Sequence, residues 1–289
     1  MTDAIPASTP ELMDEAAFLA LWQTQRLHER SPREAALEGG RLADQLAWVF
    51  VSGYQAAMRS VFPEVHSDGW LAFAVSEDRQ HPDEFPPLHV QADESEWLLT
   101  GCKSWVAQAD HLSELVVTAQ LRDRTELFRV ASDIKGLTLS RRPEPGFLAA
   151  MSQGFARFDE SPAARLDDPG RRKLFMCAEA LAMMLAATGY LAKATPESNA
   201  AAVLARNALK DCVPELGAGL DALAQGQAPD ALDMLALDER WHAGLEGWLA
   251  AVDTSMLPNF TVDQPLLSLY RKAIAHRARS SLDNQDQRS

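Results

Sequence analysis

The spacing of apolar residues changes twice along this 289-residue chain, and these changes limit its possible folds more than any other feature. From Pro10 to about Phe62, apolar residues recur at helical spacing. Residues 70–165 instead form short runs of strand composition, separated by turns that contain Pro, Asp or Gly. Helical spacing returns after the turn that ends at Gly170. The sequence therefore predicts an α+β protein of several domains.

The two changes of pattern set the predicted domain boundaries. They give an N-terminal helical segment over 1–69, an all-β domain over 70–166, a C-terminal helical bundle over 167–280 and a frayed tail over 281–289. Inside the β-domain, the runs ELVVTAQ and ELFRVAS are separated by five residues, the length of a hairpin connection. We expect these two strands to pair.

Local signals refine the helical segments. Ser31 precedes Pro32, with Glu34 in the first turn, which indicates a capped helix start. The Gly39-Gly40 pair favours an interruption of that helix. In the bundle, helices are predicted near 171–193, 197–226, 229–253 and 264–280.

Residues 174–192 are almost long and apolar enough to cross a bilayer. However, Glu179 lies inside this stretch, and Ala178, Ala182 and Ala186 recur every four residues, which gives a smooth ridge for a neighbouring helix. The pattern favours a buried helix of the bundle over a membrane span.

Composition excludes several classes of function. Forty-one acidic and 27 basic residues give a net charge of −14, which disfavours a nucleic-acid partner. Three separate cysteines and an acidic N-terminus without a signal-peptide pattern predict a cytoplasmic protein. The spacing of His66, His81, His89 and His111 matches no metal motif, so no metal site is predicted.

Three motifs then occur in one order. Gly101, Lys103 and Trp105 lie in GCKSWV, which is followed by Ala-Asp and the run LVVTA. Upstream, WLAFAVSEDRQHPDE carries Ser76 and Glu77; downstream, GFARFDESPAARL leads toward the bundle. In this order the motifs resemble the acyl-CoA dehydrogenase family, of which the chain would be a shortened and divergent member.

The resemblance implies FAD bound against the β-domain, and a bundle glutamate that removes the α-proton of an acyl-CoA thioester while hydride passes to the flavin. Carried over by position, the residues lining the flavin would be Val75, Ser76, Trp105, Val106 and Ala107. Lys103 is expected to be a solvated strand residue. The family also implies a homo-oligomer, because its bundles associate through their helices.

Several functional positions depart from the family pattern. Ala107 stands where the family has threonine or serine, which removes a hydrogen bond to the flavin. His81-Pro82 replaces a Gly-Ser pair, and proline has no amide to offer a phosphate. Arg206 lacks the following Phe-Gly of the segment that grips the FAD pyrophosphate.

The catalytic base is also missing, because the glutamate loop of the family has no counterpart after Glu246. The bundle candidates for a base are Glu215 and Glu246, and Glu239 and His242 could share a helix face. The favoured hypothesis is a non-catalytic scaffold, or a partner subunit of a full-length acyl-CoA dehydrogenase. The alternative is an FAD-dependent acyl-CoA dehydrogenase with a non-standard base, so the sequence leaves open whether the protein is an enzyme.

Overall fold

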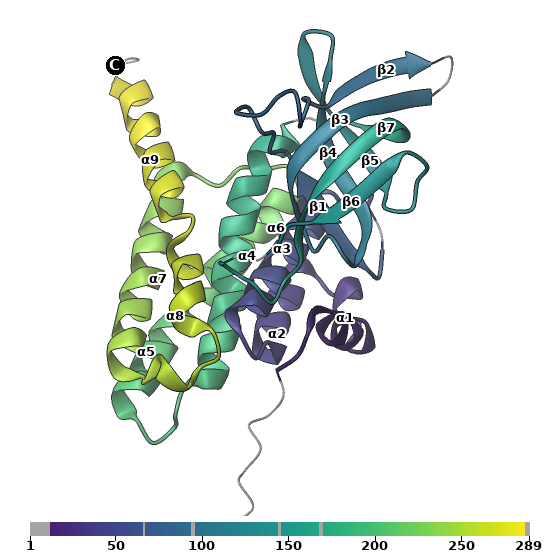
Figure 1. Ribbon diagram of the computed structural model, residues 1–289. Coiled ribbons are helices and arrows are strands. Elements are labelled where there is room, and N and C mark those ends of the chain that lie inside the picture. The colour runs from purple at the N-terminus through teal and green to yellow at the C-terminus, as the bar shows by residue number, and fades with distance from the viewer. Residues whose placement is uncertain (1–11, 66, 94–95, 144–145, 168–169, 287–289) are drawn as a thin grey trace, which may run out of the picture.

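The computed structural model describes most of the chain, and its helices gather to the left of and below a separate sheet (Figure 1). The described residues are 12–65, 67–93, 96–143, 146–167 and 170–286. The predicted order of N-terminal helices, a strand-rich middle and C-terminal helices is confirmed. Buried apolar side chains from all three segments form one continuous cluster.

The N-terminal segment consists of three α-helices and one short 3₁₀ helix. They are α1 (Glu15–Thr24), η1 (Leu27–Glu29), α2 (Pro32–Leu42) and α3 (Leu46–Val61). The predicted start of α2 is confirmed: Ser31 and Glu34 form a reciprocal capping box. Helix α3 is buried along nearly its whole length.

The glycine pair does not interrupt α2, which continues to Leu42. Gly40 instead lies against helix α4 (Arg171–Ala194), where a Cβ atom would stand 1.9 Å from the carbonyl oxygen of Ala186. On α4 itself, a Cβ at Gly189 would lie 2.2 Å from the carbonyl oxygen of Leu37. These glycines therefore allow close helix packing, which explains why the predicted interruption is wrong.

Seven strands form one sheet that closes on itself. They are β1 (Trp70–Ala74), β2 (His89–Asp93), β3 (Glu96–Ala107), β4 (Leu112–Leu121), β5 (Arg124–Ala131), β6 (Leu137–Arg141) and β7 (Gln153–Leu166). The order is β1-β4-β2-β3-β7-β5, and β5 also pairs with β4, which closes the ring. Strand β6 adds to β7, and β1 runs parallel to β4.

The predicted hairpin is confirmed, since β4 and β5 pair antiparallel from Glu114 opposite Ala131 to Leu121 opposite Arg124. Gly101, the first residue of the central motif, has a φ of +130°. A Cβ there would lie 2.3 Å from the carbonyl oxygen of Pro87. Gly101 therefore lets β3 pass close to the backbone at Pro87, an approach that a side chain at this position would block.

The C-terminal segment surrounds α4 with further helices. They are α5 (Ala200–Asp211), α6 (Val213–Ala224), α7 (Ala231–Ala251), η2 (Thr254–Met256), α8 (Phe260–Asp263), η3 (Gln264–Ser268) and α9 (Arg271–Asp286). The single helix predicted over 197–226 is two helices that meet at Cys212. Helix α9 continues to Asp286, into the stretch predicted to be frayed; residues 287–289 lie outside the described ranges.

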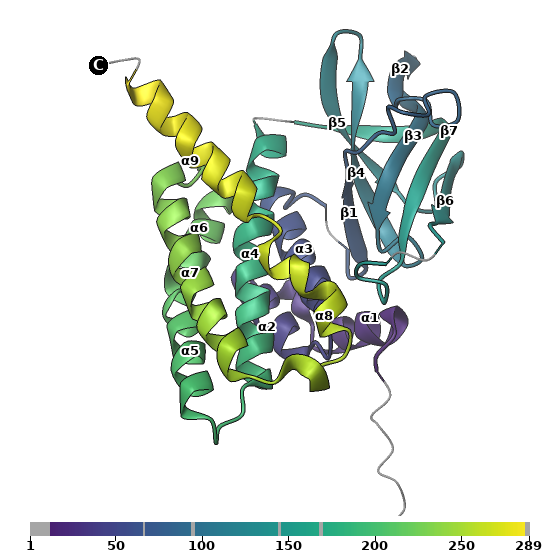
Figure 2. The same ribbon diagram turned by 60° about the vertical axis from the view of Figure 1, so that its left-hand side comes forward.

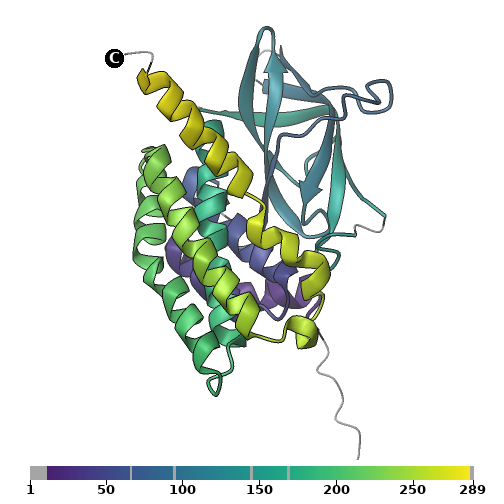
Figure 3. The ribbon, with the colours of Figure 1, turned by 90° about the vertical axis from the view of Figure 1, so that its left-hand side faces the viewer.

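Helix α4 lies between the N-terminal helices and α7 (Figure 2). It is the one helix in the described ranges that is long and apolar enough to cross a membrane, and 83% of its most apolar window is buried inside the fold. Such burial is typical of the core helix of a bundle. The C-terminal end of α9 extends past the other helices (Figure 3).

Helices α1 and α8, which are far apart in the sequence, both bond to the loop between β6 and β7. Glu15 in α1 accepts a hydrogen bond from the amide of Ser152 at 2.5 Å. Asp263 in α8 accepts one from the amide of Leu148 at 2.7 Å, where the backbone has a φ of +54°. Burial raises the pKa of both carboxyl groups, against the effect of these hydrogen bonds.

Candidate active site

Trp105 lies near the end of β3, at the junction with α3. Its indole N–H donates to the side-chain oxygen of Gln153 at 3.2 Å, which fixes the plane of the ring. The ring meets Phe50 and Tyr54 edge to face, each with centroids 6.4 Å apart. Trp105 is half-buried, so it combines a packing role with an accessible surface.

The five predicted flavin-lining residues fall into two groups. Val75 and Ser76 follow β1 and are exposed, and the carbonyl of Ser76 accepts a hydrogen bond from the amide that precedes Trp105. The end of β1 and the tryptophan are therefore neighbours. The side chains of Val106 and Ala107 are wholly buried. Three of the five residues can thus offer side-chain surface to a ring, and two cannot.

Lys103 is not solvated, contrary to the sequence expectation. It is 1% exposed, and its ammonium group donates to Glu77 at 2.6 Å and to the hydroxyl of Thr118 at 3.1 Å. Burial lowers the pKa of Lys103, while the Glu77 carboxylate opposes this shift. The motif lysine therefore connects β3 with β4 through Thr118 and with the loop after β1 through an ion pair whose lysine is buried.

In the loop after Glu77, two backbone amides donate hydrogen bonds to a side chain of the same loop. The carboxylate of Asp78 accepts hydrogen bonds from the amides of Gln80 at 2.8 Å and His81 at 3.2 Å, and it contacts the His81 ring at 2.9 Å. The His81 ring bond, with these amides, holds the pKa of Asp78 below its usual value. These two amides are therefore occupied, and a phosphate would have to displace Asp78 to reach them.

A basic cavity of about 470 Å³ lies beside Val75, between the β-domain and the start of α4. Arg79, His89 and Arg172 contribute to its lining. Glu77, which also lines the cavity, is paired with Lys103. Its volume is in the range of ligand pockets.

The two glutamates predicted as base candidates are exposed. Glu215 pairs with Arg240, with 2.9 Å between one oxygen and one guanidinium nitrogen, and this hydrogen bond lowers the pKa of Glu215. Glu246 is 70% exposed and lies 3.6 Å from Arg271. The environment of Glu215 does not favour a base that titrates near neutral pH. Arg206, which lacks the Phe-Gly of the family's pyrophosphate segment, pairs with Glu197.

Glu179 is the ionisable group that the sequence reasoning missed as a site residue. Protein atoms surround its carboxyl group, although the residue keeps some exposure to solvent. Burial raises the pKa of Glu179 to about 7, while a hydrogen bond with Tyr270 opposes the shift. A single carboxylate in an otherwise apolar helix was the signal that could have identified it.

Tyr54 connects Glu179 with the tryptophan. The Tyr54 ring contacts both Trp105 and Phe175, which lies one helical turn before Glu179 on α4. The negative charge of Glu179 helps to raise the pKa of Tyr54, after burial, so the two groups are close. The Tyr54 hydroxyl accepts a hydrogen bond from the Phe73 amide at 2.7 Å. The accessible tryptophan and the buried carboxyl group therefore belong to one region.

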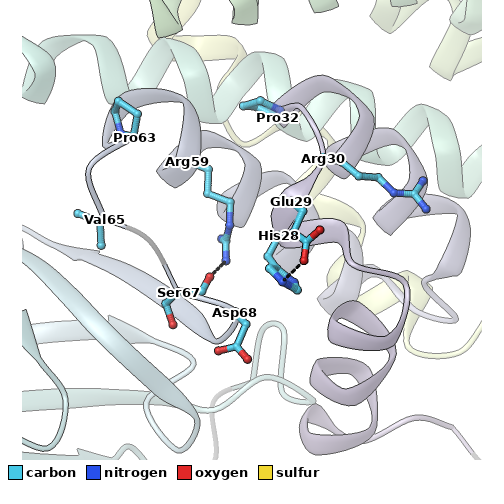
Figure 4. Close-up of a pocket in the computed structure, with 9 residues that line it drawn as sticks. All are labelled: His28, Glu29, Arg30, Pro32, Arg59, Pro63, Val65, Ser67 and Asp68. Carbon is cyan, nitrogen blue, oxygen red and sulfur yellow. Dashed lines mark hydrogen bonds and ion pairs between the residues drawn. The ribbon is translucent and has the colours of Figure 1, made fainter.

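A larger cavity of about 580 Å³ lies elsewhere, between η1 and the end of α3 (Figure 4). Arg59 on its wall donates to the carbonyl oxygens of Ser67 at 3.0 Å and Gly69 at 3.1 Å. The guanidinium group therefore ties the linker before β1 to α3. None of the predicted site residues lines this cavity. Among the described residues, no three metal-binding side chains gather into a cluster; His66 lies outside the described ranges.

The order of helices, a closed sheet and further helices matches the fold of acyl-CoA dehydrogenase-like solved structures. No family model and no curated protein matches the sequence. Solved structures do match: "PigA with FAD and proline" is 13% identical, with a TM-score of 0.63, 92% of this chain and 89% of that chain covered. The prolyl acyl carrier protein oxidase AnaB is 15% identical, with a TM-score of 0.63 and 94% and 90% covered.

An acyl-CoA dehydrogenase from Geobacillus kaustophilus is 12% identical, with a TM-score of 0.55, and the match covers 94% of this chain and 83% of that one. The predicted resemblance to acyl-CoA dehydrogenase-like FAD enzymes is thus confirmed at the level of the fold.

Proposed function

We propose that this protein is an FAD-dependent oxidoreductase that acts on an acyl thioester, with Glu179 as the catalytic base. The observation that carries the proposal is the state of Glu179, a buried carboxyl group whose pKa is raised to about 7. A general base is most effective when its pKa lies near the working pH. This favours the enzyme alternative of the two sequence hypotheses.

The residues of the site divide the work. Glu179 would take the proton from the α-carbon as its C–H bond breaks, and the Tyr270 phenol would stabilise the carboxylate before the transfer. When bound, FAD supplies the acceptor for the hydride that leaves the β-carbon. Val75, Ser76 and Trp105 would form the surface against which the flavin ring lies.

The basic cavity next to Val75 supports a phosphorylated carrier for the acyl group. Coenzyme A and acyl carrier proteins both present the thioester on phosphopantetheine, and Arg79 on the wall of the cavity would attract its phosphate. One structural neighbour is a prolyl acyl carrier protein oxidase, and another is PigA with FAD and proline. We propose a cytoplasmic homo-oligomer that acts on such a carrier-bound acyl group.

The test begins with the purified full-length chain. Flavin absorption, or stabilisation against heat by added FAD, would support cofactor binding. The Glu179→Gln variant should keep the flavin and lose acyl-CoA oxidation, measured with an artificial electron acceptor. Glu215→Gln is the matched control, because it changes an exposed glutamate, and it should keep the activity. Full activity in Glu179→Gln would exclude Glu179 as the base.

A second candidate function is the scaffold or partner subunit, and specific observations favour it. The wholly buried Val106 and Ala107 offer no side chain to a flavin, and the amides of Gln80 and His81 are already bonded to Asp78. A colourless protein that FAD does not stabilise, and that copurifies with a full-length acyl-CoA dehydrogenase, would establish this function instead.

A further inference from the structure

A buried histidine of α7, His242, faces the segment that precedes Tyr270. His242 is 5% exposed. Its Nδ1 atom lies 2.9 Å from the backbone oxygen and 3.2 Å from a carboxylate oxygen of Asp238. Its Nε2 atom lies 3.2 Å from the backbone oxygen of Leu267. Both ring nitrogens face oxygen acceptors, so both bonds form together only when the imidazole carries two protons.

The pair formed by His242 and Asp238, called the dyad below, also lies close to Arg271, the residue after Tyr270. A second carboxylate oxygen of Asp238 lies 3.9 Å from Arg271 and has no hydrogen bond within the described part of the chain. A cavity of about 10 Å³ lies between Asp238, His242, Tyr270 and Arg271. This space is close to that of one water molecule, which could join the free oxygen to its neighbours.

We propose that His242 and Asp238 position Tyr270 for its hydrogen bond to Glu179, an inference that rests on the proposed function of Glu179. The dyad holds the chain on both sides of Tyr270, through the backbone oxygen of Leu267 and through Arg271. The segment between α8 and α9 begins with the five-residue 3₁₀ helix η3 and ends at Tyr270. A 3₁₀ helix of this length has little stability of its own. External bonds are therefore needed to fix it.

The charges around His242 agree with this role. Asp238 on the same helix and Arg271 on α9 are the charged groups of the cavity, and Arg271 also approaches Glu246 at 3.6 Å. Helix α4 contributes Ala180, Met183, Met184 and Ala187 to the same cavity. Burial acts to lower the pKa of His242, but its bonds to Asp238 outweigh this effect and raise it. Both bonds are therefore present together at low pH, and one of them is lost as the pH rises through the folded-state pKa.

Two substitutions separate the bonds of the ring. In His242→Gln, the side-chain amide can still donate toward Leu267, as Nε2 does. In His242→Asn, the shorter amide can donate only toward Asp238, as Nδ1 does. The readout is the titration midpoint of Glu179, taken from the infrared carboxyl band that disappears in Glu179→Gln. Because the Tyr270 bond lowers the pKa of Glu179, His242→Asn should raise this midpoint as much as Tyr270→Phe does. His242→Gln and the exposed control His276→Asn should leave it unchanged.

The inference is overturned if Tyr270→Phe shifts the midpoint and His242→Asn does not. Should His242→Asn fail to fold, hydrogen exchange of the wild-type amides 264–271 replaces it. After correction for intrinsic rates, their protection should fall as the pH rises through the imidazole titration of His242 measured by NMR, and a flat profile refutes the proposal. Neither measurement needs flavin or substrate. A protein that shows both effects without turnover keeps this inference and loses the proposed function.

Discussion

Replacing Glu179 with glutamine should change the pH dependence of stability in a way that only a buried, raised-pKa carboxyl group can produce. The pKa of Glu179 rises from 4.5 to about 7 on folding, chiefly through burial. A shift of this size corresponds to about 3 kcal/mol of differential interaction between the two protonation states. The unfolded chain releases this proton at lower pH than the folded one, so the wild type loses stability as the pH rises from about 4.5 to 7.

Glutamine has nearly the shape of protonated glutamate and cannot ionise, so Glu179→Gln removes this loss. We expect the variant and the wild type to be about equally stable at pH 4.5. At pH 8.5 the variant should be more stable by up to about 3 kcal/mol. Urea unfolding at both pH values measures the difference. Glu239→Gln, which changes an exposed glutamate on α7, is the control and should leave the difference near zero at both.

Other titrating groups are shared by the variant and the wild type, so they cancel in this comparison. A free-energy difference that is the same at pH 4.5 and 8.5 would show that Glu179 ionises with an ordinary pKa. The assignment of Glu179 as a base poised near neutral pH would then lose its physical support. A variant that is less stable than the wild type at pH 8.5 but not at pH 4.5 would instead indicate that the carboxylate is required as a hydrogen-bond acceptor.

Three further predictions concern packing and buried charge. Gly40→Ala should destabilise the fold by about 1–3 kcal/mol or more in urea unfolding, because its Cβ meets the Ala186 carbonyl; an unchanged stability would contradict the close helix contact. Asn199→Ala removes the N-cap of α5 and the bond from the side-chain amide to the Ala251 carbonyl oxygen, and it should cost about 1 kcal/mol or more in thermal unfolding; an unchanged melting temperature would contradict this. Lys103→Met should cost about 1–3 kcal/mol, because Glu77 loses its ammonium partner. Adding Glu77→Gln should recover most of that loss, and no recovery would show that the ion pair is not the cause.

The sequence predicted the arrangement of the fold because its signals are local. The hairpin of β4 and β5 follows from two strand-forming runs and a short connection, and the capping box at Ser31 from adjacent residues. The Gly39-Gly40 prediction failed because the reason for these glycines is a helix distant in sequence, which a local pattern does not reveal. Fold class therefore follows from periodicity, whereas close approaches depend on tertiary packing.

The candidate site was predicted less completely, because side-chain environment decides it. Trp105 was identified by its motif, and its partly accessible position agrees with that interpretation. Lys103 was expected in solvent because strand periodicity does not reveal a buried ion pair. Glu179 was seen only as an interruption of an apolar helix. Burial raises its pKa, and the hydrogen bond with Tyr270, 91 residues later in the sequence, opposes this shift, so the sequence alone could not assign it.

The loop between β6 and β7 has a consequence for the order in which the protein can be completed during synthesis. The Leu148 amide obtains its hydrogen bond from Asp263, which the ribosome adds 115 residues later. The Ser152 amide can bond to Glu15 much earlier. During translation the β-domain would therefore emerge with one side of this loop fixed and the other exposed to water. The Leu148 amide obtains its acceptor only after the ribosome has released the segment that contains Asp263. A product truncated before Asp263 would leave this amide without the bond.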